Sequence, residues 1–223
     1  MNQGLGRRLS LIFDRTTDAG AGAVRSHPGA AAMHPLVDFV AYAEDCTLSG
    51  RIRLRADRLT DMLNDHEEVR LVDVMVRSLV QPEAVEVQEV VVPRDELLLV
   101  HATGPRGDQA RRTRTRQTYV DVAAGPYAVR GYLHSAPFLD AMAGLHRRSA
   151  MIPLTDAVID YPLGGDLYRQ RVGTVIVNRS RIDHITEAVE HDGAVGIAPA
   201  TDDADHAPDF GATILAASGR PSS

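Results

Sequence analysis

The chain has 223 residues, 44% of them apolar and 24% charged, which is enough apolar material for a core and excludes a wholly disordered, collagen-like or coiled-coil protein. No apolar run approaches the roughly 20 residues that span a bilayer, and the apolar stretch at residues 9–13 is too short for a signal peptide, so we expect a cytoplasmic protein without membrane contact. The formal charge of −6 belongs to the C-terminal end: from Glu187 onward seven acidic residues face one arginine, and residues 1–186 are neutral.

Both ends of the chain are predicted to be disordered tails, at residues 1–37 and 193–223. The first is rich in Gly, Ala, Ser and Arg and shows no sustained period of 2 or 3.6. The second combines acidic and small residues and cannot bury enough surface to offset the entropy of the chain. Short apolar islands, such as Ile214 and Leu215 in the second tail, are interpreted as undocked.

An internal repeat organises the region between the tails. Val40 matches Val120 at an offset of 80 residues, and the offset then rises to 85 by small steps, as expected for short loop insertions in one of two related units. The shared positions, which we interpret as structural, are Gly50 with Gly131, Asp73 with Asp156, and Arg94 with Arg179.

Each unit is predicted to contain five strands, because apolar residues alternate with polar ones over short stretches bounded by turn residues. In the first unit the strands cover residues 39–43, 47–54, 69–79, 85–92 and 97–101. In the second they cover residues 119–123, 127–134, 151–161, 168–177 and 182–185.

A short helix is predicted between the second and third strands of each unit. In the first unit Asp57 is the expected N-cap, followed by apolar residues at helical spacing. In the second unit Ser135 is the expected N-cap and Pro137 lies in the first turn. The apolar helical positions are Leu59, Met62 and Leu63 in the first unit and Phe138, Met142 and Leu145 in the second. A further short helix is expected at the end of the second unit, in the sequence RIDHITEAVEHD.

These elements predict a mainly β protein with two tandem small β-barrel units of SH3-like or Sm-like size. The first unit is expected at residues 38–102 and the second at residues 119–192, joined by an Arg-rich linker at 103–118. Units of about 65 residues bury little surface alone, which favours packing of the two units on each other.

At these positions the chain resembles an uncharacterised family of small bacterial β-domains. The family pattern is G-x-[IL], then RLSDxLN, LxD[AV] and VN[KR]xxI. The first unit supplies Gly50, RLTDMLN at residues 58–64 and LVDV at 71–74; the second supplies Gly131, LTDA at 154–157 and VNRSRI at 177–182. Each unit departs from the pattern where the other keeps it, since the second has PFLDAMAG for the helical motif and the first has PRDEL for the last one. The resemblance implies architecture and no activity.

Few residues are candidates for chemistry. Asp73 and Asp156 lie early in apolar strands, where a buried carboxylate needs hydrogen-bond donors; we interpret both as structural acceptors, with a ligand or metal role as the alternative. The nine histidines show no metal-ligand spacing, and a lone Cys46 excludes an internal disulfide and a cysteine-based zinc site. No nucleophile motif or phosphate loop is present, so we expect no enzyme and no cofactor.

The arginine cluster of the linker is the strongest charge feature. It consists of Arg106, Arg111, Arg112, Arg114 and Arg116. It is typical of a solvated loop, and contact with an anionic partner is the alternative. The spacing of Arg112 and Arg116 resembles the arginine motif of cyclic-di-GMP-binding PilZ domains, and Asp45, Thr47 and Gly50 resemble their second motif. In that family the arginine motif comes first, whereas in this chain it comes second, so we interpret both matches as chance. Nucleic-acid binding is disfavoured because the body is neutral and offers few aromatic side chains near the cluster.

The sequence therefore favours a non-enzymatic interaction or regulatory module that binds a protein partner or associates with itself through sheet edges. A nucleic-acid or cyclic-nucleotide sensor that uses the Arg-rich linker is the alternative.

Overall fold

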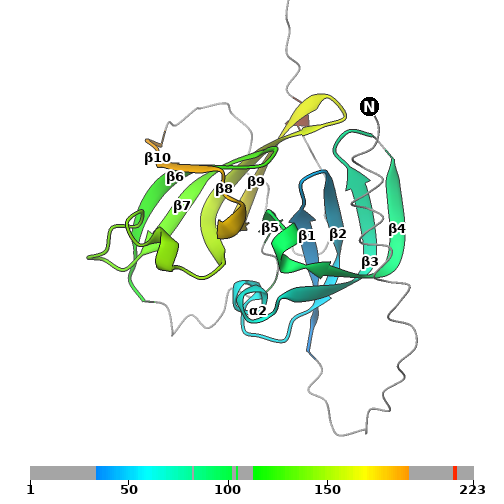
Figure 1. The fold of residues 1–223 in the computed structure, drawn as a ribbon, viewed down its shortest axis with the longest axis horizontal. Helices are drawn as coiled ribbons and strands as arrows, with labels where there is room; N and C mark the ends of the chain where they lie inside the picture. Colours follow the sequence, from blue (N-terminus) through cyan, green and yellow to red (C-terminus); the bar gives the residue numbers. More distant parts are fainter. Residues whose placement is uncertain (1–33, 82, 102–103, 105–112, 191–212, 215–223) are drawn as a thin grey trace, which may run out of the picture.

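The structure is a computed structural model that describes residues 34–81, 83–101, 104, 113–190 and 213–214. The described chain is mainly β, as predicted (Figure 1). Most of both predicted tails, and Arg106, Arg111 and Arg112 of the linker, lie outside the described residues.

In the described part of the chain ten strands follow one another in a single sheet, in the order β10-β6-β7-β8-β9-β5-β1-β2-β3-β4. Their bounds are β1 Leu36–Tyr42, β2 Cys46–Arg53, β3 Glu68–Ser78, β4 Ala84–Pro93, β5 Leu99–His101, β6 Arg116–Ala124, β7 Tyr127–Ser135, β8 Met151–Leu163, β9 Asp166–Asn178 and β10 His184–Glu187. All the pairs are antiparallel, and β4 and β10 form the two ends of the order. The sheet is therefore continuous from one half of the chain to the other, and in the described part it does not close into a ring.

The two halves of the chain, β1–β5 and β6–β10, follow the same ladder pattern. In the N-terminal half Phe39 pairs with Gly50, and in the C-terminal half Val120 pairs with Gly131. The fifth strand of each half returns to pair with its first strand, β5 with β1 and β10 with β6. The strands lie where the sequence predicts them, although β1 and β6 each begin three residues earlier than expected.

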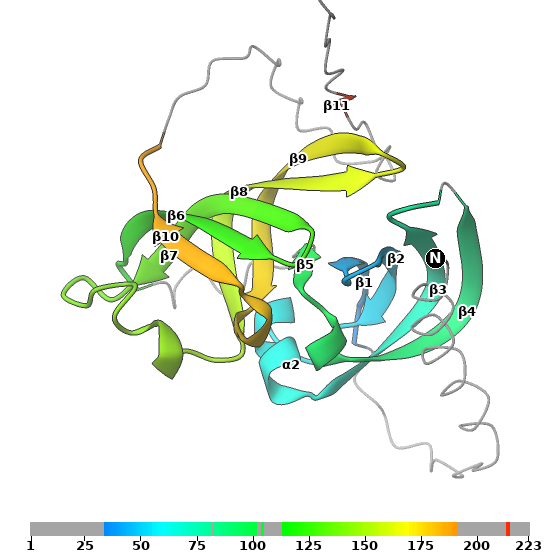
Figure 2. The ribbon, with the colours of Figure 1, turned by 45° about the horizontal axis from the view of Figure 1, so that its top comes forward.

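The halves join through β5 and β9, which pair directly. Two apolar cores result, and neither is confined to one half. The core beneath β1–β4 also takes Met151 and Ile176, and the core beneath β6–β9 takes Tyr42, Leu98 and Leu99. The β8–β9 hairpin also reaches across toward the β3–β4 hairpin (Figure 2), where the Gly164 N–H donates to Leu79 O at 2.8 Å.

The helix predicted in the first half is present as α2, Leu59–Asp65, with Leu59, Met62 and Leu63 buried. Its predicted N-cap is wrong: Arg58 holds that position, with no side-chain cap hydrogen bond.

The helix predicted in the second half is absent. Residues 136–144 form turns, and only a short 3-10 turn, η4 Leu145–Arg147, follows. The Asp140 carboxylate accepts the Met142 N–H at 2.8 Å and the Ala143 N–H at 3.3 Å, a local turn that competes with helical bonding. Phe138, expected on the buried face, is 99% exposed.

The helix predicted at the end of the second unit is also wrong. Residues 184–187 of that sequence form β10, which pairs with β6 and overlaps the strand predicted at residues 182–185. A short strand, β11 Thr213–Ile214, pairs with β9 at Tyr168 and Arg169, so Ile214 of the C-terminal tail is docked through its backbone, contrary to expectation, while Leu215 lies outside the described residues. Among the described helices none is long and apolar enough to cross a membrane.

Candidate interaction site

Four of the predicted repeat positions build one local feature in each half. Asp73 and Asp156 have positive φ angles of 52° and 50°, a conformation that Asp and Asn adopt more readily than most residues. Each lies where the third strand shifts register against the second, next to Gly50 or Gly131. A Cβ on either glycine would lie 3.0 Å from a backbone oxygen of the third strand. The Gly and Asp positions therefore form a matched bulge.

The bulge changes the interpretation of both aspartates. We expected buried carboxylates, yet both residues are exposed. The Asp73 carboxylate forms an ion pair with Arg51, whose side chain is also largely exposed. An exposed pair of this kind contributes little stability. The backbone conformation, and not a buried carboxylate, accounts for Asp at these two positions.

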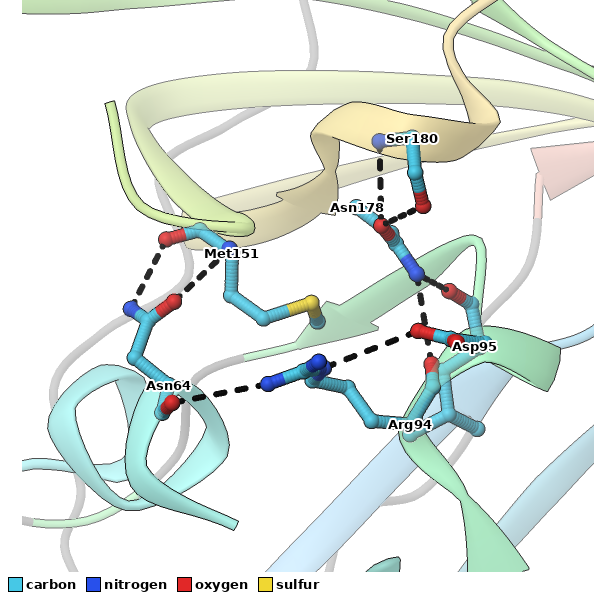
Figure 3. A network of polar contacts seen from close by, with 7 residues as sticks. Asn64, Arg94, Asp95, Met151, Asn178 and Ser180 are labelled. Atoms are coloured by element: carbon cyan, nitrogen blue, oxygen red, sulfur yellow. Dashed lines mark hydrogen bonds and ion pairs between the residues drawn. The ribbon is translucent and has the colours of Figure 1, made fainter. Parts of the chain in front are cut away.

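The junction between the halves is held by a buried amide. Asn178, at the end of β9, is 0% exposed. Its side-chain NH₂ donates to Leu97 O at 2.9 Å and to Arg94 O at 3.2 Å, both in the other half (Figure 3). Its side-chain oxygen accepts from the Ser180 N–H and hydroxyl, and its backbone N–H donates to Leu98 O at 2.9 Å. One residue thus satisfies groups on both sides of the junction.

Asn64 forms a second cross-link between the halves (Figure 3). This residue lies in α2, and its side chain accepts the Met151 N–H at 2.9 Å and donates to Met151 O at 3.1 Å. The amide therefore caps the first residue of β8 from a helix in the opposite half. Among the described residues the second half has no α-helix at this place, so the link is described for the first half alone.

Arg94 and Arg179 occupy matching places after the fourth strand of each half. The Arg94 backbone N–H donates to Glu67 O and the Arg179 N–H to Ala150 O, both at 2.7 Å. The guanidinium of Arg94 donates to Asn64 O at 3.4 Å, and that of Arg179 donates to the His146 carbonyl. Both arginines therefore hold the end of the segment that links the second and third strands.

Tyrosines fill the space where the hairpin tips of the halves meet. Tyr127 O–H donates to Ala43 O at 2.7 Å, and its ring lies 5.4 Å from that of Tyr42 in an edge-on arrangement. Burial raises the pKa of both phenols above the usual value near 10, so both stay neutral donors. Tyr161 lies 5.6 Å from Tyr42 and extends the cluster toward the surface.

A small cleft opens beside these rings, with a volume of about 40 Å³. Tyr42 donates to Gln170 Oε1 at 2.9 Å across it, and Arg77 lies on its wall. Space of this size holds a few water molecules. A nucleotide does not fit there in this conformation of the chain.

A larger shallow hollow of about 320 Å³ lies on the outer face of β6 and β7. Its wall includes Tyr119, Asp121 and Arg130. Asp121 and Arg130 are cross-strand neighbours, and Arg130 also pairs with Asp160, which Arg169 binds at 2.7 Å. The guanidinium of Arg130 on this wall is thus already paired with Asp160.

The remaining predicted site residues are exposed or undescribed. Arg114 and Arg116 are exposed at the start of β6, and the other three arginines of the cluster lie outside the described residues. Within the described ranges no group of three or more His, Cys, Asp or Glu side chains could hold a metal ion. Cys46 is buried, and burial raises the pKa of its thiol to about 12.

The open edge of β4 is the most prominent surface feature of the described chain. This ten-residue strand pairs with β3 on one side only. Val85, cross-strand from the buried Val76, is 47% exposed, and Val87 is half-buried at the rim of the core. Glu86 and Glu89 are exposed beside them, and Glu89 pairs with Arg70. The edge therefore combines backbone groups that have no strand partner among the described residues, partly exposed valines and acidic side chains.

A comparison of the chain with family models, with curated proteins and with solved structures finds no match. The resemblance to small bacterial β-domains therefore stays a prediction.

Sequence reasoning did not single out Asn64 or Asn178, although both stand in the motifs that carry the resemblance. The signal available was a polar amide directly after a run of apolar residues, as in the stretch VIVN at 175–178. A turn explains that pattern equally well, and the buried partners become visible only in the folded chain.

Proposed function

We propose that the chain is a non-enzymatic interaction module built from two repeated small β-units, and that the open edge of β4 binds an extended segment of a partner protein. The observation that carries the proposal is the comparison of β4 with its counterpart β9. The outer edge of β9 takes β5 at Val175–Val177 and β11 at Tyr168 and Arg169. The matching edge of β4 has no strand on it in the described chain.

The chemistry of the edge indicates which segment fits. Exposed backbone N–H and C=O groups favour an added strand, and side chains of such a strand alternate between the two faces of the sheet. On one face an apolar side chain would cover Val85 and Val87. On the other face a basic side chain would lie beside Glu86 and Glu89, since opposite charges stabilise cross-strand pairs. The partner segment is thus extended, with alternating apolar and basic residues.

A fluorescently labelled ten-residue peptide in which valine alternates with arginine tests this proposal by fluorescence anisotropy. We expect saturable binding, weaker at high salt because exposed charges are screened. A peptide of the same composition with the valines grouped at one end should bind at least fivefold more weakly, because it cannot present one apolar face.

A charge-reversal variant tests whether the peptide binds at the edge of β4. Glu86→Lys should weaken binding of the Val/Arg peptide at least fivefold and improve binding of a Val/Glu peptide. The matched control is Glu187→Lys on β10, another exposed acid at the opposite end of the sheet, which should leave both affinities unchanged. Equal loss in both variants would indicate non-specific charge attraction and overturn the proposal, as would absence of binding to the wild-type chain.

A further inference from the structure

Each strand of the junction between the halves has a counterpart in the other half, and these counterparts, β4 and β10, lie at the two ends of the sheet. Inside the chain, Leu99, Val100 and His101 of β5 pair with Val177, Ile176 and Val175 of β9. The shared ladder pattern allows each of these residues to be matched to one in the other half. The matched residues lie on the outer edges of β4 and β10.

The match on β4 follows from its pairing with β3. Val69 pairs with Val92, as Ile152 pairs with Val177, and the next positions are Pro93 and Asn178. Val90, Val91 and Val92 therefore take the places of Val175, Ile176 and Val177. The apolar character of this part of the junction is kept.

The match on β10 follows from its pairing with β6. Leu98 N–H donates to Tyr42 O and Asp183 N–H to Ala123 O, each at 2.9 Å. Asp183 thus takes the place of Leu98, and His184 takes the place of Leu99. Ile185 and Thr186 then stand for Val100 and His101.

Three of the matched positions differ in ways that oppose pairing. Asn178 spans the internal junction with its backbone N–H and its side-chain amide, and Pro93 has neither donor. Leu98 and Leu99 are 1% and 0% exposed in the core, whereas Asp183 and His184 are exposed. The Asp183 carboxylate accepts the Gly125 N–H at 2.7 Å, and covering the rest of this carboxylate with apolar surface would cost free energy.

We propose that β4 and β10 are the two halves of a junction that the chain uses once internally, and that Pro93, Asp183 and His184 prevent a second copy from completing it. Without these residues, β10 of one copy would pair with β4 of the next in the same register as β5 with β9. Such a head-to-tail contact does not close on itself between two copies by symmetry and would extend into chains or rings. The edge of β4 then stays available for a different partner.

This inference rests on the two-unit organisation proposed above but not on peptide binding at β4. If the chain binds no peptide but self-associates when the internal residues are restored at its outer edges, the proposed binding function is wrong and the present inference stands.

The test restores the internal residues at the outer edges. The triple variant Pro93→Asn, Asp183→Leu, His184→Leu is compared with the wild-type chain by size-exclusion chromatography with light scattering over a range of concentrations. We expect a monomeric wild-type chain and concentration-dependent dimers and larger species of the variant. Circular dichroism checks that the variant is folded.

A cross-linking experiment reports the register. Val100 and Ile176 are paired in the internal junction, so Ile185 of one copy should face Val91 of another. Chains carrying Val91→Cys are mixed with chains carrying Ile185→Cys under mild oxidation, since paired antiparallel residues lie close enough for a disulfide. The native Cys46 is buried and does not compete. A Val85→Cys chain, out of register on the same edge, is the control.

Cross-linking of Val91→Cys with Ile185→Cys should be at least tenfold more efficient in the triple-variant background than in the wild-type background and should exceed the out-of-register control. Because Asp183→Leu also removes the hydrogen bond to the Gly125 N–H, Pro93→Asn alone is tested in parallel and should raise cross-linking by a smaller factor. Monomeric, uncross-linked chains in both restored backgrounds would overturn the proposal. Equal cross-linking in wild-type and restored chains would also overturn it.

Discussion

The two halves of the chain share a strand ladder but differ in what fills the space between their second and third strands. In the N-terminal half this segment is α2, which buries three apolar side chains. In the C-terminal half it is a series of turns that leaves Phe138 and Leu139 exposed. Both halves keep the bulge of Gly50 with Asp73 and of Gly131 with Asp156. The common register is thus associated with the bulge and tolerates either connecting segment.

A second difference concerns the outer edge of the fourth strand in each half. On β9 this edge is covered by β5 and β11, and Asn178 completes the contact. On β4 it is open and ends in Pro93. The same ladder therefore gives an interior junction in one place and, among the described residues, an edge without a strand partner in the other.

Shortening one apolar side chain in each connecting segment should give the largest difference in unfolding free energy between the halves. Leu63→Ala removes a side chain that is 0% exposed in α2 and should lower the free energy of unfolding by about 3 kcal/mol. Leu145→Ala in the other half, where the side chain is only partly buried, should cost about 1 kcal/mol. Urea denaturation measures both. Equal losses would mean that the two segments contribute alike to their cores.

The junction amide should give the next largest effect. Asn178→Ala leaves the carbonyls of Arg94 and Leu97 without their donor and should cost about 2 to 3 kcal/mol. At the matching position, Pro93→Ala should change stability by less than about 0.5 kcal/mol, because no described side-chain bond is lost. Asn178→Asp, which keeps the shape and removes the donors, separates the hydrogen bonds from packing. A neutral Asn178→Ala would show that the amide does not hold the junction.

The sequence predicted the strands and α2 because apolar periodicity reflects burial directly. It failed for the second helix, where Asp140 forms a local turn and no buried face exists for Phe138. It failed again for the helix expected in RIDHITEAVEHD, where residues 184–187 pair with β6 as a strand and overlap the strand predicted at 182–185. The candidate site was less predictable still. An open edge is a property of the assembled sheet, and Pro93 at the end of β4 becomes informative only once the fold matches it with Asn178 of β9.

The bulge positions test whether their shared aspartates serve the backbone. Asp73→Gly and Asp156→Gly should leave stability unchanged or raise it slightly, since glycine adopts positive φ without strain. Asp73→Val and Asp156→Val should each cost about 1 to 2 kcal/mol, because a β-branched residue is strained there. Thermal denaturation of the four variants gives the comparison. A loss with glycine as large as with valine would instead assign the role to the carboxylate.

The smallest expected effect is a pH dependence of stability that arises from the fifth strand of the N-terminal half and has no counterpart at the matching position of β10. His101 of β5 is half-buried at the junction, and burial lowers its pKa, whereas β10 has the non-titrating Thr186 at the matching place. Because the pKa in the folded chain lies below the unfolded value of about 6.5, the folded state favours neutral imidazole. The stability of the folded chain is therefore not reduced by His101 above about pH 6.5, and stability is lost as the pH falls from there through the folded pKa of His101.

Denaturation midpoints in urea at pH 7.5 and pH 5.5 measure this effect. The wild-type chain should lose stability between the two values, and His101→Leu should lose less. Some dependence should remain in that variant, because burial also lowers the pKa of His134, which lies between the hydroxyls of Thr115 and Thr155. An unchanged pH dependence in His101→Leu would show that protonation of His101 does not destabilise the β5–β9 junction.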